Sequence, residues 1–238
     1  MELVSVFFPL RAGSSRAVGK NTRPFRLDGR SLFQHKMEQL EKISKNVAEI
    51  VISTNDEEVI AQFEGFKIID NARLVRRPDV LCNSTTKVKD LIDYVPTVVR
   101  SDHIFWLHAT SPFVDQSDYL SALDLYTKLV FSGPNDSLMS VSRLQQFIWS
   151  DSRKAIINCD RAVNPWPNTQ DLEPLYEINH AFYISSRHNY LTLSDRIGTN
   201  PALYEMHGLK KIDIDWEEDF ILAQNIIRSL EQVKNDEL

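Results

Sequence analysis

A cluster of cations follows the first apolar run of the chain. Residues 4–10 are rich in Val and Phe and lead directly into a loop of small residues, which is typical of a buried strand and its turn. The loop carries Arg11, Arg16 and Lys20. Accessible backbone amides and nearby cations can together bind several oxygens of a polyphosphate. The segment predicts a phosphate-binding loop, and the alternative is a basic surface loop.

The loop is not a Walker A motif. Five residues, instead of four, separate Gly13 from Gly19, and Lys20 is followed by Asn21 instead of Ser or Thr. The hydroxyl that binds magnesium in that motif is therefore missing from this segment.

Two aspartates near the other end of the sequence offer complementary chemistry. Residues 211–215 are predicted as a short strand, in which positions i and i+2 share a face, so Asp213 and Asp215 would project together. Such a pair suits Mg²⁺, which typically takes one or two carboxylates and completes its shell with phosphates and water. Alternatively, Asp215 only caps the helix that begins at Glu217. A cationic phosphate loop and a metal pair on one sheet predict nucleotidyl transfer.

Alternating strands and helices must position these two segments. Apolar patterns predict further strands at 49–54, 66–69, 103–107, 137–141, 180–185 and 203–206, and helices at 31–43, 57–63, 86–99, 117–130 and 217–230. This alternation predicts an α/β fold, a three-layer sandwich with a mostly parallel sheet. Ligands of such sheets bind beyond the carboxyl ends of the strands, where the polar loops of this chain fall.

Residues 142–176 break the alternation. The stretch is rich in Pro and Trp, and residues 147–149 and 155–158 form a possible hairpin. We interpret it as an insertion within a single domain that spans residues 1–238. Its aromatic residues Phe147, Trp149 and Trp166 are expected to serve packing within the insertion or a dimer, with a stacking platform for a ligand as the alternative.

Composition limits the classes of function. The 238 residues, 42% hydrophobic and 25% charged, are ordinary for a globular protein with a sizeable core. A net charge of −6 argues against nucleic acid as the main partner. The two cysteines, Cys82 and Cys159, have no metal-binding spacing. With no signal peptide and no long apolar run, we expect a cytoplasmic protein without membrane attachment.

Six stretches carry a resemblance that spans nearly the whole chain. They are residues 11–21, 51–54 (Val-Ile-Ser-Thr), 77–78 (Arg-Pro), 110–112 (Thr-Ser-Pro), 179–184 and 212–219. In this order they resemble the CMP-sugar synthetase (cytidylyltransferase) family, which includes N-acylneuraminate cytidylyltransferases and CMP-Kdo synthetases. The resemblance implies a nucleotide-diphospho-sugar transferase-like fold. It also implies a homodimer in which the insertion exchanges contacts between subunits.

The resemblance also implies roles for particular residues. Lys20, Arg11 and Asp215 would be catalytic, and Asp213 and Asp215 would hold Mg²⁺. The implied substrate contacts are Ala12, Gly13, Ser14, Arg16, Asn21, Arg77, Thr110, Ser111 and Asn179. Among these, Arg77 and Asn21 join Arg11 and Lys20 in the CTP site, whereas Asn179 would lie by the acceptor sugar.

The positions that would contact the acceptor sugar depart from the family pattern. Sialate-type members usually have Gln-Pro where this chain has His108 and Ala109, and Arg shortly after, where Val114 stands. Thr169 replaces an Arg that would meet the sugar carboxylate, and His180 replaces a Gly.

These departures leave two questions about the acceptor. Its carboxylate would need another cation, such as Arg161 or Arg143. His108 and His180 are candidate substrate contacts that could hydrogen-bond the acceptor or help remove its proton. The alternative is that both are polar residues at strand ends.

We therefore expect a Mg²⁺-dependent cytidylyltransferase that forms a CMP-linked acidic sugar of the sialic, legionaminic or pseudaminic type from CTP and releases pyrophosphate. One alternative is the same transfer onto a different acceptor, such as another acidic sugar or a phosphonate. Others are a non-catalytic nucleotide-binding relative and an enzyme that uses UTP or ATP.

Overall fold

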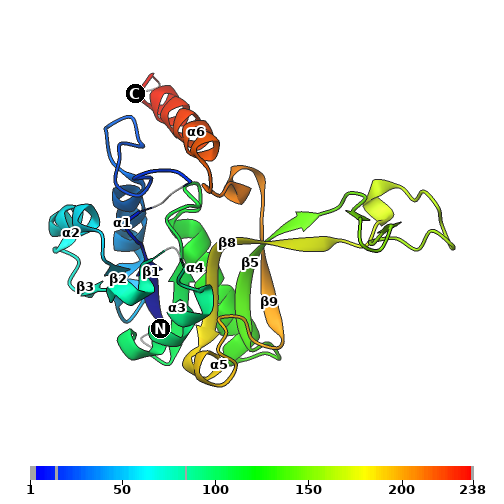
Figure 1. Cartoon of the computed structure of the whole chain (residues 1–238), viewed down its shortest axis with the longest axis horizontal. Helices are drawn as coiled ribbons and strands as arrows, with labels where there is room; N and C mark the ends of the chain where they lie inside the picture. The colour runs from blue at the N-terminus through cyan, green and yellow to red at the C-terminus, as the bar shows by residue number, and fades with distance from the viewer. Residues whose placement is uncertain (1–3, 14–15, 84, 237–238) are drawn as a thin grey trace.

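A seven-stranded sheet forms the centre of the computed structural model, which describes residues 4–13, 16–83 and 85–236 (Figure 1). The strands, in the spatial order β3-β2-β1-β4-β8-β5-β9, are Ala72–Arg76, Ile50–Thr54, Val4–Pro9, His103–Leu107, Leu175–Ser186, Ser137–Leu144 and Pro201–Met206. Strand β8 runs antiparallel to both of its neighbours, and the other pairs are parallel. The mostly parallel sheet predicted from the sequence is confirmed.

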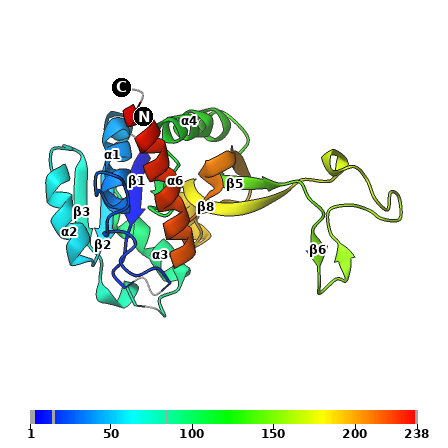
Figure 2. The same ribbon diagram turned by 90° about the horizontal axis from the view of Figure 1, so that it is seen from above.

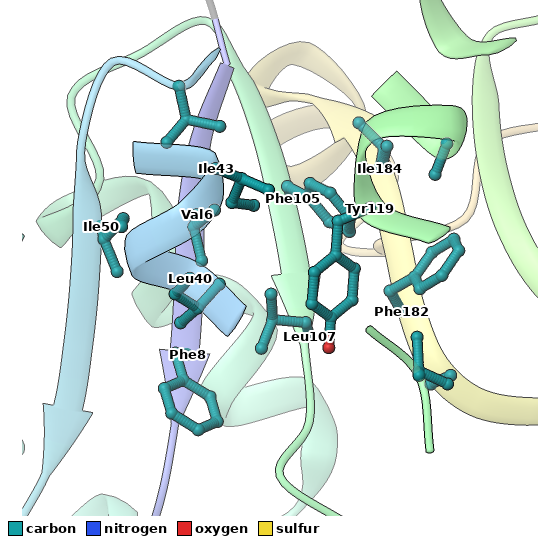
Figure 3. Packing of buried hydrophobic residues seen from close by; sticks show 14 of the residues in the cluster. Val6, Phe8, Leu40, Ile43, Ile50, Phe105, Leu107, Tyr119, Phe182 and Ile184 are labelled. Carbon is teal, nitrogen blue, oxygen red and sulfur yellow. The ribbon is translucent and has the colours of Figure 1, made fainter. Parts of the chain in front are cut away.

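Helices cover both faces of the sheet (Figures 1 and 2). They are α1 (Leu32–Ile43), α2 (Glu57–Phe63), α3 (Val88–Val98), α4 (Gln116–Tyr126) and α5 (Arg187–Thr192). The last helix, α6 (Glu217–Asp236), lies beyond the end of the sheet and packs against Phe25 and Leu32 (Figure 1). Val6 and Phe8 of β1 pack with α1 and α4 (Figure 3), whereas Phe7 points to the opposite face and packs with α3 and α5. The three-layer arrangement is therefore confirmed. Among the described residues, no helix has both the length and the apolar character needed to span a membrane.

The strand predicted at residues 66–69 is wrong. Residues 66–69 form the end of a 3-10 helix and a turn, and Ile68 is largely exposed. The strand lies further along the chain, at the sheet edge, as β3. An edge strand needs no continuous apolar run, and two of its residues are arginines, Arg73 and Arg76, which pair with Glu49 and Glu57.

The irregular segment projects from the body as an arm between β5 and β8 (Figures 1 and 2). It carries a short antiparallel hairpin formed by β6 (Trp149–Ser150) and β7 (Ala155–Ile156). Inside the arm, the rings of Phe147 and Trp166 lie edge to face with their centroids 5.4 Å apart, and the guanidinium of Arg161 lies over the Trp166 ring. Trp149 and Trp166 are nevertheless 55% and 67% exposed.

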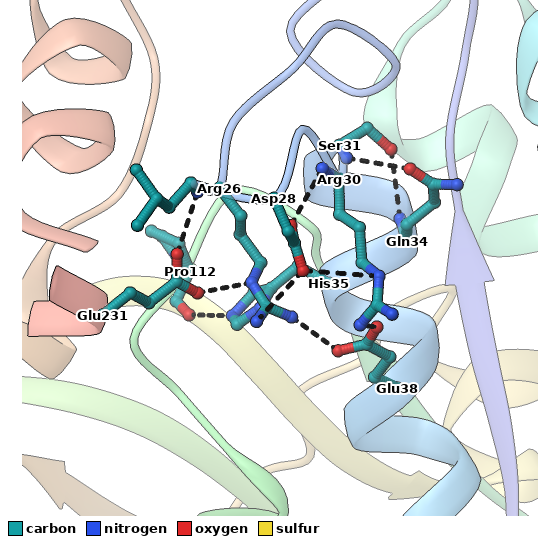
Figure 4. A network of polar contacts seen from close by, with 10 residues as sticks. Arg26, Asp28, Arg30, Ser31, Gln34, His35, Glu38, Pro112 and Glu231 are labelled. Atoms are coloured by element: carbon teal, nitrogen blue, oxygen red, sulfur yellow. Dashed lines mark hydrogen bonds and ion pairs between the residues drawn. The ribbon is translucent and has the colours of Figure 1, made fainter. Parts of the chain in front are cut away.

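Ion pairs attach the segment after β1 to two helices (Figure 4). Arg26 pairs with Glu38 of α1 at 2.6 Å and with Glu231 of α6 at 2.5 Å. Nearby, Arg23 makes two hydrogen bonds to Glu217 at the start of α6. These arginines therefore hold the segment between α1 and α6.

Lys36 is a fully buried cation in the layer between α1 and α4. Its Nζ donates hydrogen bonds to the Val114 carbonyl at 2.6 Å and to the Tyr119 hydroxyl at 2.8 Å. Burial lowers the pKa of Lys36 to about 7, and the carboxylates of Asp118 and Asp115 only partly oppose this shift.

Replacing this lysine should change how stability depends on pH. The unfolded chain keeps the Lys36 proton up to about pH 10, whereas the folded protein releases it near its pKa of about 7. Because the unfolded state binds more protons in this window, the free energy of unfolding should rise with pH there. Urea unfolding of the wild type and of Lys36→Met across the window measures this contribution. Equal pH slopes for the two proteins would show that Lys36 does not titrate as expected.

Candidate functional site

A cavity of about 450 Å³ opens at the carboxyl ends of β1 and β4. Its wall contains five cations, Arg11, Arg16, Lys20, Arg77 and Arg196, and two carboxylates, Asp213 and Asp215. This is the edge of the sheet at which the sequence predicts a ligand. The excess of positive charge favours an anionic ligand.

The basic loop and the acidic segment meet at this cavity. Arg16 pairs with Asp215 at 2.9 Å, and Lys20 Nζ donates a hydrogen bond to the Ile214 carbonyl. Burial lowers the pKa of Lys20, and the carboxylates of Asp213 and Asp215 oppose the shift. Cations and carboxylates that lie almost 200 residues apart in sequence therefore face each other, 199 residues in the case of Arg16 and Asp215.

The acidic segment is not a strand, and this prediction is wrong. A 3-10 helix, Gly208–Lys211, comes first, and the following residues are not paired in the sheet. The buried Ile214 holds the segment, because its N–H donates to the Thr110 carbonyl at 2.9 Å. Asp213 and Asp215, on either side of it, both line the cavity.

A different carboxylate lies at the start of α6. The Asp219 side chain accepts hydrogen bonds from the N–H groups of Asp215 and Trp216, at 3.0 Å and 2.7 Å. The Asp215 side chain instead pairs with Arg16. The helix-cap interpretation of Asp215 is therefore not what the structure shows.

The chemistry of Asp213 fits a bound cation. Its Oδ1 is buried and has no hydrogen-bond partner among the described residues. Burial raises the pKa of Asp213, the Thr110 hydroxyl opposes the shift, and the neighbouring charge of Asp215 adds to it. The described residues contain no cluster of three or more His, Cys, Asp and Glu side chains that could hold a metal. A pair of carboxylates is nevertheless a donor set that Mg²⁺ accepts when phosphate and water complete its shell.

Several of the other predicted nucleotide contacts line the cavity. Asn21 and Thr110 line the cavity together with Arg11 and Arg77. The buried Arg77 donates to the Ser53 carbonyl and, at 3.2 Å, to its hydroxyl, so its guanidinium is held against β2.

Ala12 and Gly13 are not part of the cavity wall, whereas Ala17 of the same loop is. The N–H of Ala12 donates to Asn55 Oδ1 at 3.1 Å, and Gly13 has a φ of +74°, which glycine adopts without strain. Ser14 lies outside the described residues.

His108 is positioned with both ring nitrogens engaged. Its Nε2 accepts a hydrogen bond from Trp106 Nε1 at 2.8 Å, so Nδ1 carries the proton and donates to the His180 carbonyl. Burial lowers the pKa of His108 to about 3, and the nearby Arg196 adds to the shift. This neutral imidazole has no free nitrogen for proton transfer, which contradicts the suggested role of His108 as a base.

His180 lies where β8 bulges. The register of β8 with β5 shifts between Met139 and Val141, and the His180 backbone has a φ of +59°. The side chain is exposed at the cavity, and its Nδ1 lies 2.7 Å from the Tyr183 hydroxyl. Partial removal of the ring from water lowers the pKa of His180, Arg196 adds to the shift, and the carboxylates of Asp213 and Asp215 oppose it.

Two further predicted contacts are internal. Asn179 is buried; its Oδ1 accepts from Ser140 Oγ at 2.6 Å and its Nδ2 donates to Ser142 Oγ at 3.2 Å. It therefore supports the bulge next to His180. Ser111 is also buried, and neither side chain is part of the cavity wall.

Arg196 is the site residue that the sequence does not reveal. It lies between α5 and β9, and only 9% of it is exposed. Its guanidinium carbon lies 3.9 Å from the centroid of the Tyr183 ring and 4.7 Å from that of Trp106. No motif surrounds it, and a single Arg in a polar turn resembles many surface arginines.

Comparison with known proteins agrees with this geometry. A family model described as cytidylyltransferase matches residues 6–237. The chain belongs to the cytidylyltransferase family. The N-acylneuraminate cytidylyltransferase of Streptococcus agalactiae serotype V is 25% identical over 223 residues, which are 90% of this chain and 50% of that protein. The chain thus spans about half the length of this curated relative and of its counterparts from serotypes III and Ia.

Two solved structures share the fold. The 4-diphosphocytidyl-2C-methyl-D-erythritol synthase of Anaerococcus prevotii has a TM-score of 0.67 at 14% identity, with 95% of this chain and 96% of that chain covered. A CMP:2-keto-3-deoxy-manno-octonic acid synthetase in complex with CTP has a TM-score of 0.63 at 18% identity, with 95% and 98% covered. The predicted nucleotide-diphospho-sugar transferase-like fold is confirmed.

The tautomer of His108 can be tested without a substrate. Because the pKa is about 3, the ring should keep the ¹⁵N shifts of a neutral Nδ1–H imidazole from about pH 8 to about pH 5. The His108→Gln variant would identify the resonance by its loss. A titration midpoint within that range would contradict the arrangement in which both ring nitrogens of His108 are hydrogen-bonded.

Proposed function

We propose that this protein transfers CMP from CTP to a hydroxyl group of an acidic sugar and releases pyrophosphate. The observation that carries the proposal is the meeting of Arg11, Arg16 and Lys20 with Asp213 and Asp215 in one cavity. Membership of the cytidylyltransferase family and the fold of a synthetase solved with CTP support the choice of nucleotide. We propose an acceptor of the sialic, legionaminic or pseudaminic type because the curated relatives are N-acylneuraminate cytidylyltransferases.

The cations of the cavity would bind the triphosphate. Arg11 and Arg77 lie on the side of β1 and β2, and Lys20 lies next to the two carboxylates. In this position Lys20 would stabilise the charge that develops on the pyrophosphate as it leaves. Arg16 is more than half exposed in its pair with Asp215 and can exchange that partner for a phosphate.

Asp213 and Asp215 would hold Mg²⁺. A bound Mg²⁺ would neutralise charge on the α-phosphate and so favour attack by the acceptor hydroxyl. The buried Oδ1 of Asp213, which has no hydrogen-bond partner in the described part of the chain, supports this assignment. The Lys20 ammonium near both carboxylates limits their repulsion before a metal binds.

Of the two cavity histidines, His180 is the one whose imidazole can still contact an acceptor, because both ring nitrogens of His108 are hydrogen-bonded. The Nδ1 of His180 contacts Tyr183, whereas its exposed ring reaches the cavity. We propose that His180 hydrogen-bonds the acceptor. His108 instead holds the His180 backbone through the bond from its Nδ1.

Asp215→Asn should reduce pyrophosphate release from CTP by about 100-fold or more, because the amide lacks the charge that a metal requires. The assay uses Mg²⁺ and a panel of acceptors: N-acetylneuraminate, Kdo, legionaminate, pseudaminate and simple phosphonates. Glu218→Gln, an exposed carboxylate in the same segment, is the matched control and should keep full activity.

The outcomes separate the alternatives. Unchanged activity of Asp215→Asn would refute the metal assignment. CTP binding without pyrophosphate release for every acceptor would point to a nucleotide-binding relative, and faster release from UTP or ATP would refute the choice of nucleotide.

We also propose that the arm mediates a homodimer. It projects from the body (Figure 2). Its large apolar side chains Val163, Trp149 and Trp166 are each more than half exposed. Exposed apolar groups gathered on one segment are typical of a protein–protein contact.

The double variant Trp149→Ser/Trp166→Ser should therefore sediment as a monomer under conditions in which the wild type sediments as a dimer. Ile68→Ser serves as the control, because Ile68 is 79% exposed but lies outside the arm. A monomeric wild type, or a dimer that survives the double substitution, would refute the proposal.

A further inference from the structure

Arg196 is a buried cation with few partners of its own. A guanidinium has five N–H donors, and the structure gives Arg196 one hydrogen bond, from Nη2 to the Tyr183 hydroxyl at 3.2 Å. Among the described residues it forms no ion pair within 4.0 Å. A charge removed from water in this way needs a counter-ion, and the residue lines an open cavity.

The position of Arg196 differs from that of the other cavity cations. Arg11 follows β1, and the guanidinium of Arg77, at the end of β3, is held against Ser53 of β2. Arg196 instead lies over Trp106 of β4 and Tyr183 of β8. The strand order β2-β1-β4-β8 separates these two groups across the sheet. A triphosphate bound by the first group leaves Arg196 for a second anionic group.

The guanidinium is also held in place before any ligand binds. It stacks on two aromatic rings, and the loop that follows it is anchored by Asp136. That carboxylate accepts hydrogen bonds from Thr199 N–H at 2.6 Å and from Asn200 N–H at 3.0 Å. The Gly198 N–H donates to Ser137 Oγ at 2.9 Å. A preorganised donor loses little entropy on binding.

His180 completes this group. Its Nδ1 and Arg196 Nη2 both contact the Tyr183 hydroxyl, so the two side chains lie side by side at the cavity. The φ of +59° at His180 is unfavourable for a residue with a Cβ atom. A backbone that places an imidazole here at an energetic cost is typical of a functional site.

We propose that Arg196, with His180 beside it, binds the carboxylate of the acceptor sugar and so selects acidic acceptors. This inference rests on the proposed function, since it assigns the acceptor side of the same cavity. A planar fork of N–H donors matches a carboxylate in two parallel hydrogen bonds. The bound carboxylate would fix the sugar with its reacting hydroxyl toward the nucleotide.

The test compares N-acetylneuraminate with its methyl ester, which lacks the negative charge. Binding is measured by calorimetry in the presence of α,β-methylene CTP, and turnover is measured with CTP. Arg196→Met should weaken binding of the acid about 100-fold and abolish the preference for the acid over the ester. Arg196→Lys, which keeps the charge but not the fork, should lose about ten-fold. The affinity for CTP should not change in either variant.

A second variant and a folding control complete the test. Arg161→Met tests whether a cation of the arm binds the carboxylate instead; a loss there and none at Arg196 would overturn the inference. If the thermal midpoint shows that Arg196→Met does not fold, the test is the predicted ten-fold loss of acid binding in Arg196→Lys.

The proposed function and this inference fail in different ways. Absence of pyrophosphate release from wild type with every acceptor refutes the function, while the calorimetry still tests Arg196. Equal binding of the acid to wild type and Arg196→Met overturns the inference while turnover stands. If wild type binds neither N-acetylneuraminate nor the other acids of the panel, the inference is also overturned.

Discussion

Attraction between the loop after β1 and the segment before α6 is the interaction on which the site depends. Arg16 meets Asp215, Lys20 bonds the Ile214 carbonyl, and Arg23 bonds Glu217 further out. The pair of Arg16 and Asp215 is about half exposed, so its two charges are only weakly bound to each other. Their partners can therefore change when a phosphate and a metal enter. The same contacts hold the two segments together and leave the site accessible to a charged ligand.

The fold was predictable where burial on both sides of the sheet produces a continuous apolar run. The runs at β1, β2 and β4 correspond to central strands covered by helices on both faces. Strand β3 was missed because it lies at an edge and includes Arg73 and Arg76. The alternating pattern at residues 211–215 does not form a strand, because α6 and its apolar neighbours, instead of a second layer over a sheet, bury the Ile214 side chain. The Ile214 N–H donates to the Thr110 carbonyl instead of to a neighbouring strand.

The candidate site was predictable where local sequence carries the chemistry. Lys20, Arg77 and the pair of aspartates lie in short motifs, and the structure brings them to one cavity. Arg196 was not predictable, because its environment is built by Trp106 and Tyr183 from other strands. The family resemblance implied that Asn179 lies by the acceptor sugar, whereas its buried amide supports the backbone of β8 and is not part of the cavity wall.

At position 180 the backbone conformation favours glycine, whereas the proposed contact with the acceptor requires an imidazole. Glycine adopts a φ of +59° without strain, whereas a residue with a Cβ atom loses about 1–2 kcal/mol there. Selection for thermal stability alone would therefore favour glycine at this position and remove the imidazole from the cavity. With His180 in its proposed role at the acceptor, a glycine here would stabilise the protein and reduce its selectivity, so this residue should be kept when the fold is engineered.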